Sequence, residues 1–245
     1  MADNIGSGTS TAVASYLYLD GNRFRLRVNF ISVETLRRVK DVEFMGGNPA
    51  LDFADTIGGF LVDEPAVEDE LLREYEDLVE FGLKTGTLSE RSAWRLRRAA
   101  RERPEEAERV LEDARAKRAL IDAAFRPLSE GAEPPAPVLA ELRDFGAEAL
   151  THCELAPSGD GFGCAWEHCE DLEAPLWPIA HAALELLTDG PLDRIKTCGR
   201  CRWLFIDTTK NHSRRWCTTE GCGTDEKKER YVARRRARRA RSSSA

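Results

Sequence analysis

Helical periodicity dominates the middle of this chain. Leu71, Leu72, Tyr75, Leu78 and Val79 recur at intervals of three and four residues, which is typical of the buried face of an amphipathic helix. The same spacing predicts further helices over residues 87–103, 104–125, 138–150 and 173–188. A Thr-x-x-Glu capping box begins the first of these at Thr87, and a proline suits the first turn of the second.

Shorter stretches follow the two-residue period of β-strands instead. Residues 23–31 alternate basic and apolar side chains, and residues 152–156 and 162–167 flank a Ser-Gly-Asp-Gly turn that predicts a β-hairpin. Residues 44–56 combine a Gly-Gly turn with a brief apolar run, which predicts a strand or a strand leading into a loop. Together these elements predict an α+β fold, with a mainly helical body, short strands and one hairpin.

Charge divides the chain in a way that its whole-chain net charge of −7 conceals. Residues 1–190 carry 20 Lys and Arg against 37 Asp and Glu, whereas residues 191–245 carry 16 against 6. An acidic body with a basic tail is typical of proteins that bind nucleic acid. Gly190-Pro191 ends the last apolar helix and marks the boundary between the two parts.

The sequence gives no sign of a membrane segment or a secretory signal. It lacks a run of about 18 uncharged apolar residues, and its N-terminus has no basic region followed by an apolar stretch. We therefore expect a cytoplasmic protein that has no membrane partner.

Four of the seven cysteines lie in the basic tail, as Cys198-x2-Cys201 and Cys217-x4-Cys222. Two thiolates separated by a short turn can point at one ion, and two such knuckles complete the tetrahedron that Zn²⁺ prefers. Because protein would fill all four positions, we expect one structural zinc ion. The alternatives are four unrelated buried cysteines, or His212 in place of one of the cysteine ligands.

Basic side chains surround this cysteine cluster. Arg214 and Arg215 precede the third cysteine, and residues 226–241 predict a basic helix. One face of that helix carries Lys227, Arg230, Arg234, Arg238 and Arg241. Such a helix can lie along phosphates or enter the major groove, so we expect these residues and the arginine pair to bind nucleic acid. The alternative is a charged helix that docks on the acidic body of its own chain.

Two further groups in the body carry candidate chemistry. Gly47, Asp52, Asp55 and Thr56 could line a small-molecule pocket, or they could form a turn that satisfies its own backbone. Five potential metal ligands lie in the predicted hairpin or directly after it, namely His152, Cys153, Cys164, His168 and Cys169. Adjacent His-Cys pairs on a strand point to opposite faces, so buried cysteines and unrelated histidines are favoured over a second metal site. No nucleotide-binding, metalloprotease or serine-hydrolase motif occurs, and we predict that the chain is not an enzyme.

These residues together resemble the bacterial CGNR zinc-finger proteins, whose finger follows an N-terminal domain called ABATE. The matching finger elements are the four cysteines, LFIDTT (204–209), Arg214-Arg215-Trp216-Cys217, and Cys222-Gly223 before the basic helix. Upstream, GGNPALDFADT (46–56) resembles the glycine and LDFVNT signature that opens the ABATE domain. The resemblance covers about residues 43–238. It implies a mainly helical body joined to a small treble-cysteine-knuckle zinc finger with a basic C-terminal helix.

Two departures from the family pattern bear on function. Thr224 and Asp225 stand where the family has Asn and Arg, and Asp55 stands at the asparagine of LDFVNT. If the family's Arg contacts phosphate, Asp225 weakens DNA binding or shifts it to the later arginines. If that Arg only braces the finger, the replacement changes little.

The resemblance implies a stress-related transcriptional regulator, and we predict four segments. These are a partly disordered extension (1–42), an ABATE-like body that senses a signal or dimerises (43–190), a CGNR-type finger with its helix (191–241) and a disordered tail (242–245). The finger would bind DNA, with RNA as the alternative nucleic acid, and the body could take a small-molecule effector or form a homodimer. The rival functions are a protein-interaction module that binds acidic protein surfaces, and an enzyme with an unrecognised site in the body.

Overall fold

The computed structural model describes residues 11–20, 23–32, 38–57, 70–166 and 171–242, with side chains described between residues 38 and 236. The chain divides into two compact units, residues 1–37 and 38–245. The tail expected to be disordered therefore lies outside the described residues from position 243 onward, as do residues 1–10 of the expected extension.

The first unit contains an antiparallel hairpin. Strand β1 (Thr11–Asp20) pairs with β2 (Arg23–Ser32) along its whole length. The alternating pattern over residues 23–31 therefore predicts β2 correctly. Strand β1 supplies the backbone donors and acceptors that β2 needs. That the extension over residues 1–42 is partly disordered stays a prediction.

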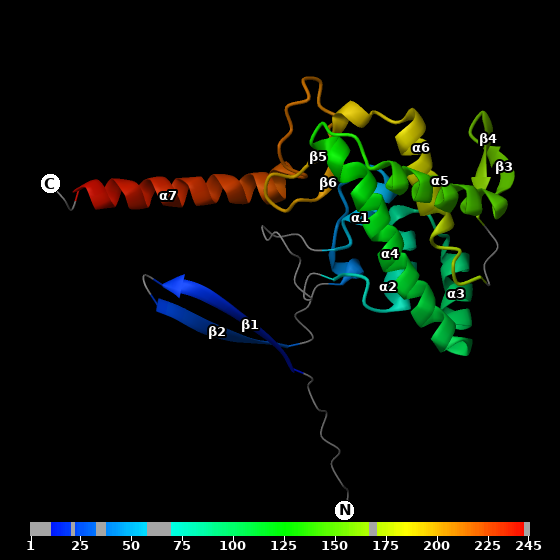
Figure 1. The fold of residues 1–245 in the computed structure, drawn as a ribbon, viewed down its shortest axis with the longest axis horizontal. Helices are drawn as coiled ribbons and strands as arrows, with labels where there is room; N and C mark the ends of the chain where they lie inside the picture. The colour runs from blue at the N-terminus through cyan, green and yellow to red at the C-terminus, as the bar shows by residue number, and fades with distance from the viewer. Residues whose placement is uncertain (1–10, 21–22, 33–37, 58–69, 167–170, 243–245) are drawn as a thin grey trace, which may run out of the picture. The chain divides into compact units, whose positions relative to one another are not determined.

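The second unit is a mainly helical α+β fold, which confirms the predicted fold class (Figure 1). Its helices are η2 (Val39–Asp41), α1 (Pro49–Ala54), α2 (Tyr75–Thr85), α3 (Glu90–Glu102), α4 (Pro104–Ser129), α5 (Ala136–Thr151), α6 (Trp177–Asp189), η4 (Leu192–Arg194), η5 (Thr219–Gly223) and α7 (Thr224–Ser242). Its strands form two antiparallel hairpins, β3 (Glu154–Ser158) with β4 (Gly161–Ala165), and β5 (Ile195–Thr197) with β6 (Leu204–Ile206).

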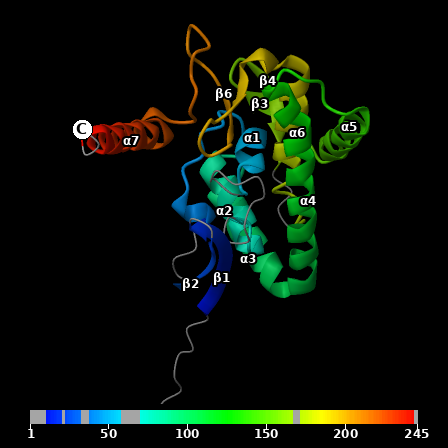
Figure 2. The same cartoon turned by 60° about the vertical axis from the view of Figure 1, so that its left-hand side comes forward.

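Helix α4 organises the core of this unit. Its 26 residues contact α1, α2, α3, α5 and β5. Figure 1 shows α4 running from the α3 end toward β5, and Figure 2 shows α3 and α4 meeting at their connected ends. The largest fully buried side chains come from α1, α2, α4 and β6, namely Phe53, Phe81, Phe125 and Phe205. One continuous core therefore joins the helical body to the β5–β6 hairpin. In the part of the chain that the structure describes, no helix has the length and apolar character to span a membrane.

The segment expected to form a strand over residues 44–56 is instead the short helix α1. Asn48 caps its N-terminus by accepting a hydrogen bond from Ala50 N at 2.8 Å, and Pro49 occupies the first turn. An asparagine followed by a proline is a helix-start signal that outweighs the brief apolar run. The turn at α1 buries Leu51 and Phe53 completely.

Helix α3 begins at Glu90, two residues after the boundary that the predicted capping box implies. Its N-cap is Ser89, whose hydroxyl accepts from Ser92 N at 3.1 Å. Thr87 is not the cap, because its backbone N–H and its hydroxyl both donate to Gly82 O at the end of α2.

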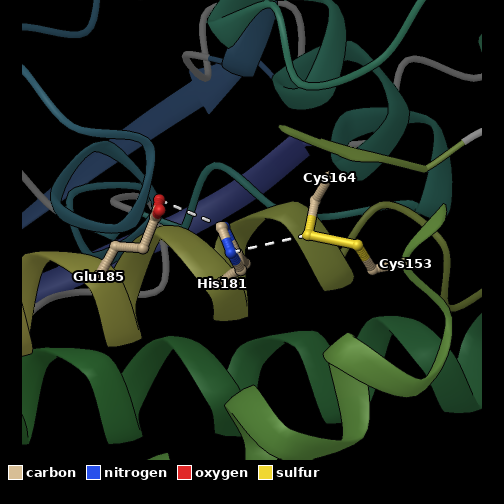
Figure 3. Close-up of a disulfide and its surroundings, with 4 residues drawn as sticks. All are labelled: Cys153, Cys164, His181 and Glu185. Atoms are coloured by element: carbon tan, nitrogen blue, oxygen red, sulfur yellow. Dashed lines mark hydrogen bonds and ion pairs between the residues drawn. A yellow bond between two sulfur atoms is a disulfide. The ribbon is translucent and has the colours of Figure 1, made fainter. Parts of the chain in front are cut away.

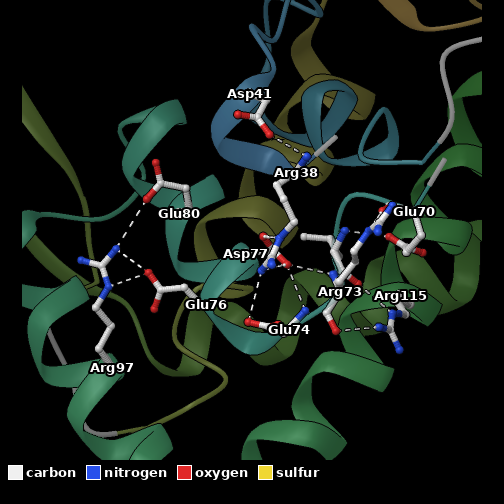
Figure 4. A network of polar contacts seen from close by, with 11 residues as sticks. Arg38, Asp41, Glu70, Arg73, Glu74, Glu76, Asp77, Glu80, Arg97 and Arg115 are labelled. Carbon is white, nitrogen blue, oxygen red and sulfur yellow. Dashed lines mark hydrogen bonds and ion pairs between the residues drawn. The ribbon is translucent and has the colours of Figure 1, made fainter. Parts of the chain in front are cut away.

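A charged cluster fixes the start of α2 (Figure 4). Asp77 accepts backbone hydrogen bonds from Arg73 N and Glu74 N at 3.0 Å, which satisfies free donors of the first turn. Arg38 donates to both oxygens of the same carboxylate at 2.8 Å. This bidentate pair ties the segment before η2 to the helical body.

Candidate metal centre

The four cysteines of the basic tail converge on one point. Their sulfur atoms all lie within 4.8 Å of one another, with 3.5 Å between Cys201 and Cys217 and 3.6 Å between Cys217 and Cys222. Four sulfurs at the corners of a tetrahedron with Zn–S bonds of 2.3 Å are about 3.8 Å apart. The observed spacing is therefore that of a single ion held by four thiolates.

Two backbone turns present these sulfurs. In the first, Cys198 N donates to Trp203 O at 2.7 Å and Arg202 N donates to Cys198 O at 3.1 Å, while Arg202 takes a positive φ of 63°. In the second, Thr218 caps η5 by accepting from Gly221 N at 2.8 Å. Gly199 N also donates to Arg215 O at 3.0 Å, so the two turns are joined to each other.

His212 is not part of the cluster. Its ring nitrogen Nδ1 lies 3.8 Å from the Asp193 carboxylate, and its backbone has a positive φ of 49°. The group of potential ligands in the described residues consists of the four cysteines alone. The alternative in which His212 replaces a cysteine is therefore wrong.

A buried carboxylate orders the long loop between the two knuckles. Asp207 accepts hydrogen bonds from Lys196 Nζ at 2.6 Å, from Thr209 N and Oγ1, and from Arg214 N at 2.9 Å. Burial alone would raise the pKa of Asp207, but these four donors lower it well below its ordinary range. The Asp-Thr-Thr sequence was a visible signal for this turn, whereas Lys196 was not expected from sequence.

Arg214 points into the finger rather than toward a ligand. Its guanidinium donates from Nε to Trp216 O at 3.0 Å and from Nη2 to Cys217 O, and it lies 4.9 Å from the centre of the Phe205 ring. The expectation of a phosphate contact is not supported for Arg214, because two nitrogens of its guanidinium already donate hydrogen bonds to carbonyl groups of the finger. Arg215 is exposed and lies over the Trp216 ring at 5.4 Å.

Helix α7 starts directly at the second knuckle. Thr224 donates from its hydroxyl to Thr219 O at 2.9 Å, and Asp225 lies in the first turn, where a negative charge favours the helix dipole. Arg200 of the first knuckle donates to Glu229 at 2.7 Å. The residues that replace the family's Asn and Arg thus serve as helix-start residues here.

The basic helix does not dock on the acidic body. Every residue from Lys227 to Arg236 is exposed, which includes Arg230 and Arg234. Arg238 lies further along α7, beyond the described side chains. The intramolecular alternative is therefore wrong for residues 227–236, and this surface remains available to a partner.

The body holds the finger through the segment that was expected to line a ligand pocket. Asp55 Oδ1 accepts from Leu204 N at 2.8 Å, and Gly46 O accepts from Ile206 N at 2.9 Å, so both contacts reach strand β6. Asp52 accepts from Gly46 N at 2.6 Å. These contacts make the GGNPALDFADT segment a cradle for the finger.

The other two residues expected at that pocket lie within the same cradle. Gly47 has a positive φ of 76°, and Thr56 donates from its hydroxyl to Phe53 O at 2.7 Å. Whether these residues also meet a ligand stays a prediction. Sequence reasoning missed Phe44, whose ring stacks on Trp203 at 6.2 Å across the junction between body and finger.

Both carboxylates of the cradle sit in an environment that favours the neutral form. Burial raises the pKa of Asp52 to about 6, against the hydrogen bond from Gly46 N, which lowers it. Burial also raises the pKa of Asp55 well above its ordinary range, and Asp55 Oδ2 has no hydrogen-bond partner among the described residues.

The hairpin cysteines differ from prediction. Cys153 and Cys164 form a disulfide across β3–β4, so they are neither unpaired buried cysteines nor ligands of a second metal. Period-two alternation could not reveal this pairing, because it does not say which of three nearby cysteines meet. His152 stacks on Trp177 at 4.0 Å, and His168 and Cys169 lie outside the described residues.

Two backbone knuckles with four convergent thiols define a zinc finger with a structural metal centre. Comparison with known protein families agrees with this assignment. A model of the CGNR zinc finger matches residues 194–235, and the ABATE model, described as "Putative stress-induced transcription regulator", matches residues 47–190. The chain belongs to the ABATE family and carries a CGNR finger. No curated protein matches the chain.

The CGNR match and the clustered thiols together fit one structural zinc ion. When bound, the ion would hold the two knuckles together. Cys198, Cys201 and Cys217 are buried and Cys222 is half-buried, so the protein itself supplies a closed set of four soft donors. The matched families are of regulator and zinc-finger types.

Proposed function

We propose that this protein is a transcriptional regulator that binds duplex DNA through α7 and the neighbouring Arg215. One observation carries the proposal: ten consecutive residues of α7, Lys227–Arg236, are exposed, with six basic residues and one acidic residue among them. The stretch is mostly charged, although Tyr231 and Val232 within it are also exposed, and a helix of this kind is not stabilised by packing on its own chain. Phosphates supply the missing counter-charges, and the major groove admits a helix of this diameter.

The finger gives α7 a fixed direction. Helix α7 follows Cys222 and Gly223 without a linker, and the Arg200–Glu229 ion pair connects it to the first knuckle. Zinc therefore orders the start of the helix, while Lys227, Arg230 and Arg234 contact phosphates and Arg238 extends the same face. We assign Arg214 to bracing the finger and Arg215 to the DNA surface.

The acidic body is proposed as the part that receives the signal, either through a small-molecule effector or through formation of a homodimer. Asp52 and Asp55 serve the link between this body and the finger. The function would place the protein with the DNA, in the cytoplasm of a bacterial cell.

The test is the salt dependence of binding to a random 30-base-pair duplex, measured by fluorescence anisotropy with the zinc-loaded full chain. If about six phosphates are neutralised, log K falls against log[salt] with a slope near −5. The variant K227Q/R230Q/R234Q should weaken binding and reduce the slope to roughly −2 or −3, because each lost phosphate contact removes about one unit.

A matched control removes the same charge from the body. R91Q/R101Q/R109Q changes three exposed arginines of α3 and α4 and should leave both affinity and slope unchanged. Equal effects of the two triple variants would contradict a specific role for α7. A wild-type slope near zero would reject nucleic-acid binding, and tighter binding to an RNA duplex of the same sequence would assign RNA as the partner.

A further inference from the structure

The hairpin at the edge of the helical body carries a disulfide beside a histidine and a glutamate (Figure 3). Cys153 directly precedes β3 and Cys164 lies within β4, so the bond joins the start of a hairpin to its second strand, and backbone pairing already fixes the register of that hairpin. Both cysteines are half-buried rather than enclosed in the core.

His181 of α6 reaches one of the two sulfurs. Its Nε2 lies 3.8 Å from Cys164 Sγ, and its Nδ1 lies 3.2 Å from Glu185 Oε2, one turn further along the same helix. Trp166 packs its ring against the imidazole at 5.7 Å in an edge-on arrangement. The carboxylate holds the proton on Nδ1, so Nε2 faces the sulfur and can exchange a proton with it.

This arrangement suits thiol–disulfide exchange. The rate of exchange rises when the leaving sulfur departs as a stabilised thiolate, and an imidazolium beside Cys164 provides that stabilisation. The hairpin is also accessible, since Leu155 and Phe162 on it are 76% and 75% exposed. The four cysteines of the metal centre are not joined in disulfides. Zinc binds cysteine as the thiolate, so these cysteines must stay reduced, and surroundings that keep thiols reduced also attack accessible disulfides.

We propose that Cys153–Cys164 is a redox-active pair that exchanges with dithiols, with His181 as its acid–base group. A dithiol thiolate attacks Cys153 Sγ, the S–S bond breaks, and Cys164 leaves as a thiolate that takes the Nε2 proton of the His181 imidazolium, which keeps its other proton on Nδ1 beside Glu185. The second thiol of the reagent gives its proton back to His181 Nε2 and, as a thiolate, attacks the mixed disulfide and releases Cys153 as a thiolate. Two electrons pass from the dithiol to the protein, and the reagent ends as a cyclic disulfide. The reverse reaction with an oxidised dithiol restores the bond.

The test measures how fast dithiothreitol reduces the native, zinc-loaded full chain. Samples are quenched with an alkylating reagent, and digestion after glutamate separates the two cysteines for mass spectrometry. The background variant Cys169→Ser removes the third cysteine of this region. We expect both cysteines to become alkylated without denaturant, and His181→Asn to slow the reaction by about a hundredfold, the lower end of the range for general acid catalysis.

Two further variants keep the outcome interpretable. Glu185→Gln should slow reduction severalfold with the fold intact, because the Glu185 side chain is 66% exposed. His152→Asn is the matched control, since its ring stacks on Trp177 instead, and it should leave the rate unchanged. Reduction that requires denaturant, or a wild-type rate in both His181→Asn and Glu185→Gln, would show a purely structural disulfide and overturn the proposal.

Discussion

At the scale of single residues, two carboxylates that the sequence placed in a ligand pocket instead accept hydrogen bonds from the protein's own backbone. Asp52 braces the Gly46 turn and Asp55 reaches across to Leu204 in the finger. Both are buried, and an ionised carboxylate without a paired cation is costly there. Their protonation therefore couples to the stability of the junction between body and finger.

For Asp52 the sign of this coupling follows from its raised pKa. The pKa is about 6 in the fold against an ordinary 3.8, so the folded state holds the proton more tightly than the unfolded state between those values. The contribution of Asp52 is fully present below about pH 4 and is lost as the pH rises through 6. Asp52→Asn keeps an acceptor for Gly46 N but cannot ionise.

We therefore expect the unfolding free energy of Asp52→Asn, relative to wild type, to increase by roughly 2–3 kcal/mol from pH 4 to pH 7. Urea unfolding at each pH measures it, and taking the difference between the two proteins cancels protons bound by the zinc thiolates. Asp160→Asn, in the exposed turn of the β3–β4 hairpin, gives the baseline. A difference that stays constant with pH would mean that Asp52 is ionised throughout in the folded protein.

At the scale of elements, the cradle that receives β6 depends on one glycine. A Cβ added at Gly46 would lie 2.8 Å from Asp52 Oδ1 and 2.9 Å from Leu51 Cβ, while Gly46 also bonds to Ile206 of the finger through its carbonyl. The backbone at this point must pass so close to α1 that no side chain fits.

Gly46→Ala should accordingly destabilise the second unit by roughly 1–3 kcal/mol, the usual range for an overpacked core position. The matched control is Gly161→Ala in β4, where an added Cβ meets no atom within 4 Å. Chemical unfolding followed by tryptophan fluorescence measures both, because Trp203 lies at the junction with the body. Similar unfolding free energies for the two variants would mean that α1 moves away from the added Cβ without a loss of stability.

The sequence predicts these elements unevenly, and the reasons are physical. Long helices and the metal knuckles are local patterns, so periodicity and cysteine spacing place α4 and the zinc cluster correctly. Periodicity also finds α2, but it wrongly includes Leu71 and Leu72, which precede the first helical residue, Tyr75. The cradle is not local, because Asp55 meets a backbone N–H 149 positions away. Polar residues beside two glycines look the same in a sequence whether they surround a ligand or another part of the chain. The bracing role of Arg214 could not be predicted for the same reason, since the sequence does not show whether an arginine side chain points into the fold or toward solvent.

At the scale of the molecule, the body and the finger of the second unit share one core and are not connected by a flexible joint. Besides the cradle contacts, Arg126 of α4 donates to Arg202 O at 3.0 Å and Ser129 of α4 bonds to Thr197 of β5 at 2.7 Å. Leu204 and Phe205 are fully buried between the two parts. Metal binding that orders the knuckles must therefore also stabilise the helical body.

This coupling predicts how the protein responds to loss of zinc. A strong chelator should lower the melting temperature of the whole second unit by roughly 10 °C in a single cooperative transition, the shift that a loss of about 4 kcal/mol produces in a unit of this size. Circular dichroism at 222 nm follows the helices, and near-ultraviolet signals follow Trp203 and Trp216. Cys198→Ser/Cys201→Ser should melt like the chelated wild type and should not respond to the chelator. Two separate transitions, with the helical body melting at its zinc-loaded temperature, would show instead that the finger rests on the body without stabilising it, and a signal received by the body would then need another route to α7.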